Sequence, residues 1–373
     1  MSSRNQIELR IKGQSYQGWK SVEIQKSLEQ IAGTFGLAVS DRYPQKPADW
    51  KIQMGDQCTV EIDGQVVITG YIEDFRMSFD RQQHEIQVSG RDLTGDLVDC
   101  SYVGSKNEWK NQTVRAVVEA LCEPFDLIDV VVDASAATQA ARKVEEFKAN
   151  EGDSVSELIV KACKTRGVLV VSYGDGDLTL TQAGSKQAAD TLEVGQNILS
   201  SQMTLSDKDR FSDYYVKGVG RGKKTKQLKD FVRPKGHATD EVMSRYRPLV
   251  VLGEHAMDVK TAEDRAKWEL SLRAGKSRSV EYSVQGWTQS DGKVWEINTL
   301  VKVKDKVLDV NGTLLIAALR YSVDDRSGTI TRLTLVDPQT YKLLSSPVMT
   351  KKGGGIAKPA FDLDTEVAQA KSK

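Results

Sequence analysis

The glycine- and lysine-rich stretch from Gly218 to Lys224 is the first place in this chain where chemistry could be expected. Backbone amides in glycine loops bind anions such as phosphate. A P-loop, however, places four residues between its glycines before Gly-Lys-Ser/Thr, and a dinucleotide fingerprint needs a third glycine two residues further on and a helix directly after it. The stretch has neither pattern. We interpret it as a loop that leaves a strand.

The same loop, Gly220 to Gly236, concentrates positive charge. Such a run is either a solvated face or a contact with an acidic partner or with DNA phosphates. Its only aromatic residue is Phe231, so stacking on nucleic-acid bases is poorly supported. We predict a partner-contact loop, and its basic residues are Arg221, Lys223, Lys224, Lys226, Lys229, Arg233 and Lys235.

The remaining reactive residue types do not form a recognisable site. His84, His237 and His255 are scattered without the spacing of metal ligands. There is no G-x-S-x-G nucleophile elbow, although a Ser-His-Asp triad stays open because triads assemble in space. The Asp324-Asp325 pair is typical of an ordinary loop. We therefore expect no catalytic centre, no metal and no cofactor.

The bulk composition narrows the class of protein. A chain of 373 residues suggests two or three domains. The 52 basic and 52 acidic residues cancel, which argues against a dedicated nucleic-acid binder but leaves a local basic patch open. No signal peptide and no apolar run of membrane-spanning length is found, so we expect folding in the cytoplasm. Four cysteines without C-x-x-C pairs predict buried free thiols: Cys58, Cys100, Cys122 and Cys163.

The elements that must position any site are mainly strands. Period-2 alternation near Ile7, Cys58 and Ile86 predicts half-buried strands in the first hundred residues, with Asp63-Gly64 as a hairpin turn. A similar pattern returns after about Leu192, with strands at 214–219, 280–284, 300–303, 314–318 and 330–336. Asn311-Gly312 and Ser327-Gly328 are expected to supply further turns.

The stretch from Gly286 to Asp305 is the most distinctive part of the second β-rich region. Asp291-Gly292 lies between two extended segments and predicts a tight hairpin turn in which both turn residues have positive φ. Trp287 and Trp295 flank the turn and can pack as large apolar groups. The stretch contains no catalytic group.

Two helix-containing segments interrupt the β pattern. In the middle segment, an amphipathic helix from Thr113 to Pro124 and a second helix with a Ser154-x-x-Glu157 capping box predict a small α/β module. Gly167 is placed to end the second helix. Later, a helix over residues 262–273, which Thr261 could cap, follows the basic loop and is interpreted as part of an insertion.

These patterns predict an α+β, mainly β, fold: two β-barrel-like domains with a small α/β module between them and an α/β insertion in the second barrel. The expected limits are 1–101 for the first barrel, 102–190 for the module, 191–222 with 279–342 for the second barrel, 223–278 for the insertion, and 343–373 for a flexible tail.

Several segments, in order along the chain, resemble the baseplate hub protein of Mu-like contractile-tailed phages, a family related to the T-even phage hub and to the late control protein D family. They are Tyr16–Val39, Gly90–Ser101, Trp109–Val114, the RGVLV and GDGDLTLT segments, Arg245–Val251, and the GWT and GKVWEINTLVKV segments. The set spans residues 16 to about 340. No single motif is decisive, but the ordered set is specific.

The resemblance implies a structural role rather than catalysis. It implies a homotrimeric ring in which each subunit gives two barrel-like domains, adapts the six-fold tail tube to the three-fold central spike, and lets DNA pass without specific binding. The implied partners are other copies of the chain, the spike, the tail tube and the wedge proteins, in a virion baseplate assembled in the host cytoplasm without membrane insertion. A tail-associated cell-wall hydrolase and a DNA-binding module are the alternative functions.

Overall fold

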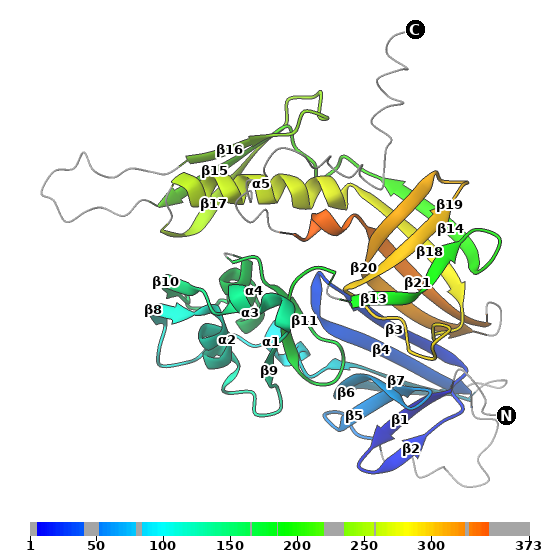
Figure 1. The fold of residues 1–373 in the computed structure, drawn as a ribbon. Helices are drawn as coiled ribbons and strands as arrows, with labels where there is room; N and C mark the ends of the chain where they lie inside the picture. Colours follow the sequence, from blue (N-terminus) through cyan, green and yellow to red (C-terminus); the bar gives the residue numbers. More distant parts are fainter. Residues whose placement is uncertain are drawn as a thin grey trace, which may run out of the picture.

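The computed structural model describes residues 6–40, 52–79, 84–164, 166–184, 186–219, 235–256, 259–324 and 328–342. Its main feature is a 13-stranded sheet that both β-rich regions build together (Figure 1). The predicted α+β, mainly β, fold class is confirmed. The two regions are not separate sheets, however, because β3 of the first pairs with β20 of the second.

The first β unit follows the order β3-β4-β7-β6-β5-β1-β2 within the large sheet. Inward-facing residues alternate with wetter ones, which is the pattern of an antiparallel sheet with one buried face. Asp63 and Gly64 both have positive φ, 49° and 78°, as a type I′ turn requires, so the hairpin predicted there is confirmed. Its strands are β1 (Ile7–Ile11), β2 (Gln14–Tyr16), β3 (Ser21–Ser27), β4 (Gln30–Ser40), β5 (Gln57–Ile62), β6 (Gln65–Phe79) and β7 (His84–Asp92).

The second β unit repeats this arrangement. Its order, β14-β18-β21-β20-β19-β13, matches β3-β4-β7-β6-β5-β1 strand for strand, both in space and along the sequence. The one difference in direction is that β1 runs antiparallel to β5, whereas β13 runs parallel to β19. Its strands are β13 (Lys186–Glu193), β14 (Ile198–Leu205), β18 (Arg278–Gln285), β19 (Thr299–Asp305), β20 (Val310–Asp324) and β21 (Gly328–Val336).

The small α/β module has a hydrophobic core of its own. Both predicted helices form, and the capping box is confirmed, because Ser154 and Glu157 exchange side-chain-to-backbone hydrogen bonds of 3.0 and 3.2 Å. Gly167, with φ 68°, follows the end of the second helix as predicted. The elements are α1 (Gly95–Asp99), β8 (Glu108–Thr113), α2 (Val114–Cys122), β9 (Val130–Val132), η1 (Ala134–Ala136), α3 (Ala137–Ala140), β10 (Lys143–Lys148), α4 (Val155–Lys164), β11 (Leu169–Val171) and β12 (Leu178–Thr181).

The insertion forms a separate sheet of three strands, β16-β15-β17, with the long helix α5 packed against it (Figure 1). The strand expected at 214–219 in the second barrel was assigned to the wrong sheet: it is part of β15 and pairs only with β16 and β17 among the described strands. Thr261 is not a cap, because the helix already begins at Val259. The elements are β15 (Asp213–Val219), β16 (Lys235–Thr239), β17 (Pro248–Ala256) and α5 (Val259–Lys276), and η3 (Pro338–Thr340) follows the second β unit.

The fold tests two further predictions. Asn311-Gly312 is not a turn, because both residues lie in β20 and pair with β19; the turn precedes them and includes Asp309, with φ 54°. Cys58, Cys122 and Cys163 are buried free thiols, but Cys100 is exposed. Among the described helices, none combines the length and apolar character needed to cross a membrane. The predicted tail at 343–373 lies outside the described residues.

Candidate functional site at the junction of the two β units

The junction between the two β units is an antiparallel pairing of β3 with the second half of β20. It runs from Ala318 opposite Ser27 to Val323 opposite Val22. On the inner face, Ile24 and Tyr321 pair directly and are both buried. On the outer face, Glu23 and Arg320 form an ion pair across the two strands. The junction is therefore built like the interior of a single sheet rather than as a loose contact between domains.

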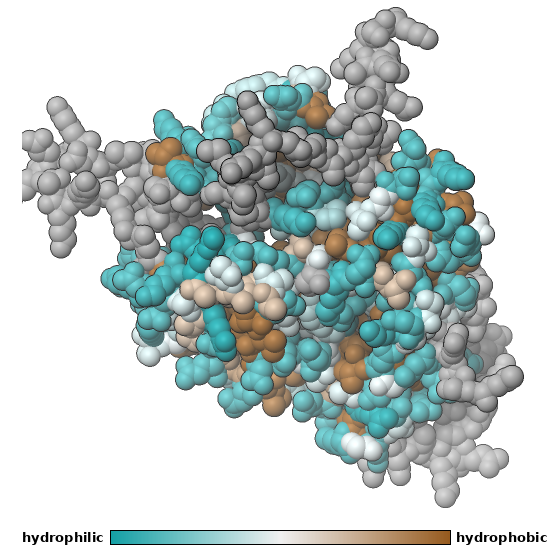
Figure 2. Space-filling view, viewed as in Figure 1, coloured by the Kyte–Doolittle hydropathy of each residue, from teal (hydrophilic) through white to brown (hydrophobic). Residues whose placement is uncertain are grey.

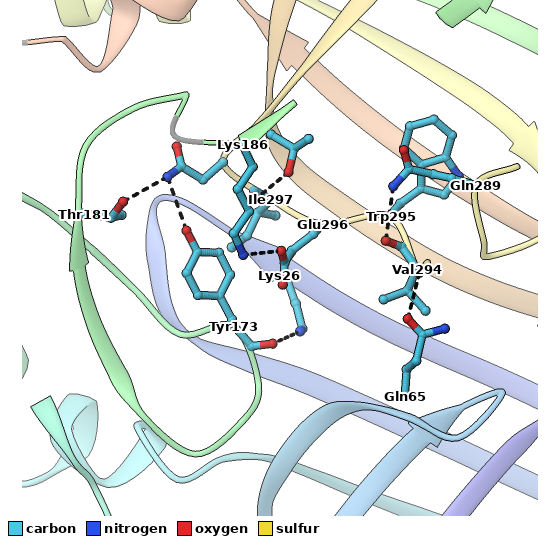
Figure 3. Close-up of polar contacts among 12 residues, drawn as sticks. Lys26, Gln65, Tyr173, Thr181, Lys186, Gln289, Val294, Trp295, Glu296 and Ile297 are labelled. Atoms are coloured by element: carbon cyan, nitrogen blue, oxygen red, sulfur yellow. Dashed lines mark hydrogen bonds and ion pairs between the residues drawn. The ribbon is translucent and has the colours of Figure 1, made fainter. Parts of the chain in front are cut away.

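A buried lysine ties the module to this junction. Lys26 lies in β3, is 6% exposed, and donates a hydrogen bond of 2.5 Å from Nζ to the backbone oxygen of Tyr173, which lies between β11 and β12 (Figure 3). Burial lowers its pKa to about 8, because the charged ammonium is penalised away from water; the carboxylates of Glu296, Asp92 and Asp175 oppose this shift. One side chain thus links the first β unit to the module.

The second β unit contacts the same loop through two polar side chains. Lys186 forms an ion pair of 2.6 Å with Glu296, and its Nζ lies 4.0 Å from the ring centre of Tyr173. Asn298, fully buried, donates to the Tyr173 hydroxyl at 3.3 Å and to the Gln182 carbonyl at 2.9 Å, and accepts from the Gly184 amide at 2.9 Å. Figure 3 shows Lys26, Tyr173, Lys186 and Glu296 converging from different segments.

The tryptophan loop, residues 286–298, also crosses the junction. The tight turn predicted at Asp291-Gly292 forms, because the Gly292 amide donates to the Gln289 carbonyl at 3.0 Å and an antiparallel bridge joins Thr288 to Val294. The predicted turn type is wrong, because only Gly292 of the pair has positive φ. The predicted packing is confirmed, because Trp287 and Trp295 are 1% and 3% exposed. The loop is fastened from the first β unit, since Gln65 donates to the Gly292 carbonyl at 2.9 Å and accepts from the Val294 amide at 3.3 Å (Figure 3).

A buried carboxylate supports the first unit beside the junction. Asp92 is 1% exposed, and burial raises its pKa. Its oxygens accept from the amide of Gly33 at 2.7 Å and from the amide and hydroxyl of Thr94. These bonds hold the end of β7 against β4, next to the start of α1. The carboxylate is engaged in holding the backbone and is not positioned as a general acid or base.

The polar groups of the junction serve to fix geometry. The described residues contain no cluster of three metal-ligating His, Cys, Asp or Glu side chains. Lys26, Asn298 and Glu296 each bond to a segment other than their own. Hydrogen bonds are strengthened in a low-dielectric interior, so these contacts favour one arrangement of the elements they connect. The site therefore serves to hold the two β units and the module in a fixed arrangement.

The predicted partner-contact loop lies almost entirely outside the described residues. This applies to Arg221, Lys223, Lys224, Lys226, Lys229 and Arg233. Lys235 is described: it is exposed and begins β16, where it pairs with Lys217 of β15. Two residues further on, His237 stacks on Tyr215 at 4.4 Å and contacts Asp213 at 2.9 Å. The junction residues were missed from the sequence, because Lys26 lies far along the chain from Glu296 and Asn298, and the three residues match no motif spacing.

Comparisons with known proteins place this geometry in a family. Residues 6–92 match the N-terminal domain of the Mu phage baseplate assembly protein GpP-like family, and residues 94–182 match the second domain of the baseplate hub protein gp44-like family. Residues 258–344 match the fourth domain of the GpP family. The matches cover the first β unit, the module and most of the second β unit.

Whole-chain comparisons agree. The chain is 33% identical over 356 residues to the baseplate hub protein gp44 of Escherichia phage Mu, covering 94% of this chain and 93% of that protein. It is similar to the 43 kDa tail protein of prophage MuSo2 from Shewanella oneidensis, with a TM-score of 0.78, 33% identity and coverage of 91% and 99%. A tail protein from Neisseria meningitidis MC58 shares the fold, with a TM-score of 0.78, 23% identity and the same coverage. The protein therefore belongs to the family of baseplate hub proteins of Mu-like phages.

Proposed function

We propose that this hub protein acts as a homotrimeric ring that adapts the six-fold tail tube to the three-fold central spike. The observation that carries the proposal is that one chain contains the same strand arrangement twice, joined edge to edge through β3 and β20. Three copies would supply six similar β units around one axis. Such a ring offers a near-six-fold face to the tube while keeping the true three-fold symmetry that a trimeric spike needs.

The role that follows is structural rather than catalytic. The hydrogen bonds and ion pairs of the junction fix the angle between the two β units, and a closed ring requires such a fixed angle in each subunit. DNA would pass through the opening during ejection. The equal numbers of basic and acidic residues, 52 and 52, support this, because a strongly basic channel would retain phosphates. The ring would assemble in the host cytoplasm and function in the virion baseplate.

Light scattering coupled to size exclusion, followed by imaging of the same fractions, tests the ring. The expected mass is three times 41.3 kDa, about 124 kDa, with an annular projection. Titration with duplex DNA should give no salt-dependent binding that would mark a dedicated DNA-binding module. A chain that stays monomeric at high concentration, or that cleaves peptidoglycan, would overturn the proposal.

The basic loop is proposed to contact a protein partner, either the spike or a wedge protein. Lys223, Lys224 and Lys226 carry much of its charge. Reversing all three to Glu should weaken co-assembly with an acidic partner surface, and changing them to Ala should weaken it less, because neutral side chains do not repel. The readout is the salt dependence of co-purification with spike and wedge proteins. Unchanged co-assembly of the Glu variant would remove the loop from the interface.

A further inference from the structure

The two β units correspond residue by residue, and this sets a common numbering. In the first unit, the pairing of β6 with β7 shifts register between Ile72 and Asp74; in the second, the pairing of β20 with β21 shifts between Ile316 and Ala318. Both long strands have 15 residues. Aligning the two shifts places β6 on β20, and the ladders that follow then place β4 on β18 and β3 on β14.

In the second unit, the second half of β20 is paired on both sides. The first half of β20 pairs with β19, the second half pairs on the same side with β3 of the first unit, and β21 covers the other side from Leu315 onward. Its counterpart β6 is not. The β5 side of β6 is bonded as far as Ile72, which exchanges backbone hydrogen bonds with Gly55 and Asp56; beyond it, the described residues give β6 a partner on one side only, β7. The stretch from Asp74 to Phe79 is therefore a free strand edge at the position where β20 holds a partner.

The strand equivalent to β3 has the complementary free edge. Among the described strands, β14 pairs only with β18 and stands at the end of the large sheet. β3 uses the corresponding side to bind β20. Within its described residues, each chain thus has one copy of this junction already formed, and one copy of each of its two halves without a partner strand. We propose that β6 of one subunit pairs antiparallel with β14 of the next, in the register of the junction inside the chain.

The alignment fixes which residues meet. Tyr321 opposite Ile24 becomes Met77 opposite Met203, and Leu319 opposite Lys26 becomes Phe75 opposite Leu205. Met77 and Leu205 are among the exposed large hydrophobic residues, at 54% and 59%, whereas Tyr321 and Ile24, both inside the chain's own junction, are 1% and 0% exposed. Apolar side chains on an uncovered edge strand are an aggregation hazard that a native partner strand removes.

The polar pair of the junction is also matched. Arg76 stands at the position of Arg320, and Gln202 stands at the position of Glu23, the ion-pair partner of Arg320. A glutamine amide oxygen can accept a hydrogen bond from a guanidinium, so Arg76 and Gln202 could form a hydrogen bond where Arg320 and Glu23 form an ion pair. On the face of the molecule shown in Figure 2, apolar residues lie in separate patches among hydrophilic ones. Narrow apolar edges, rather than one broad apolar face, suit a strand-to-strand contact.

This inference rests on the proposed ring and specifies its seam. The contact is heterologous, since two different strands meet, and such contacts repeat head to tail until the assembly closes. Because the seam has the pattern of the junction inside the chain, one continuous sheet would run from unit to unit around the ring. The partner recognised by both free edges is a second copy of this chain.

Cysteine cross-linking of the full-length protein tests the seam. In a Cys100→Ser background, which removes the exposed native thiol, the variant Met77→Cys with Met203→Cys should give covalent dimers and trimers under mild oxidation. Directly opposed residues in an antiparallel pair have Cα atoms about 4.5–5.5 Å apart, within the range of a disulfide. The matched control is Met77→Cys with Leu199→Cys, because Leu199 is also exposed on β14 but lies four residues, about 13 Å, further along. It should cross-link at least tenfold less.

A second variant separates the seam from the ring. Met77→Lys places a charge at an exposed site, so the subunit should fold, yet its trimer mass should fall toward that of a monomer in light scattering. If the parent protein is trimeric while the Met77/Met203 pair fails to cross-link and Met77→Lys stays trimeric, the seam is wrong and the hub proposal stands. If the parent protein is monomeric, both are wrong.

Discussion

Replacing Lys26 with methionine should change how the stability of this protein depends on pH. The pKa of Lys26 is about 8 in the folded protein, against 10.5 for an unperturbed lysine. Between these values the unfolded chain binds more protons than the folded one, so the free energy of unfolding rises with pH. Below about pH 8, both states are protonated and the penalty for burying the charge is present in full. Above about pH 10.5 the penalty is gone.

The magnitude follows from the size of the shift. A gap of about 2.5 pKa units at about 1.36 kcal/mol per unit gives roughly 3 kcal/mol. Methionine has a similar length and no charge, so the Lys26→Met variant lacks this term. The variant also leaves the Tyr173 carbonyl without its donor, at a cost of about 1–3 kcal/mol. That cost does not titrate, so it cancels when the two proteins are compared across pH.

The assay is urea unfolding of both proteins at equal concentration, from about pH 7 to about pH 10. The parent protein should gain about 2–3 kcal/mol over the variant across this window. Lys302→Met, at an exposed position in β19, serves as the control and should keep the parent's pH profile. Parallel profiles for the parent and Lys26→Met would refute the reasoning, because they would mean that Lys26 is hydrated or neutralised in the folded state.

Three further substitutions, one of them a control, test the packing of the module and of the insertion. A Cβ on Gly174, with φ 88°, would lie 1.9 Å from the Val67 carbonyl oxygen, whereas Gly152, with φ 93°, has open space around it. Gly152→Ala should lower the free energy of unfolding by about 1–2 kcal/mol because of its φ alone, and Gly174→Ala by about 1–3 kcal/mol more because of the clash. Equal urea midpoints for the two variants would contradict the clash. Asp240→Asn breaks the buried ion pair with Arg210, 2.6 Å long, and should cost about 3–5 kcal/mol in the same assay; a loss below about 1 kcal/mol, as expected for an exposed pair, would contradict it.

Local rules predicted the features that depend on neighbouring residues alone. The Asp63-Gly64 turn forms because both residues reach positive φ at little cost, and the Ser154–Glu157 capping box forms because its two bonds close within one helical turn. The mainly β class follows from alternation. The same rules predicted the turn at Asp291-Gly292 but the wrong turn type, since Asp291 lacks positive φ; Gln65, more than two hundred residues away, bonds to this loop.

Alternation of apolar residues identifies a strand but not its partner. The strand at 214–219 was predicted correctly but assigned to the wrong sheet. The alternation of buried and exposed residues is the same whichever sheet a strand joins, so it does not identify the partner strands. Asn311-Gly312 has a sequence typical of a turn, yet both residues pair with β19 as part of β20. The turn lies before them and includes Asp309. Burial along both strands outweighs a local turn preference, since a slip would turn every inward residue to water.

The sequence by itself determined the strand-rich class, the module helices and the resemblance to phage hub proteins, because these depend on short-range patterns and on ordered segments. Only the tertiary structure revealed that the two β regions share one sheet through β3 and β20 and that Lys26, Glu296 and Asn298 meet at one loop. It also revealed that β6 and β14 have corresponding edges without a partner among the described strands. Pairing between strands hundreds of residues apart leaves no local signature, since backbone hydrogen bonds are the same for every sequence.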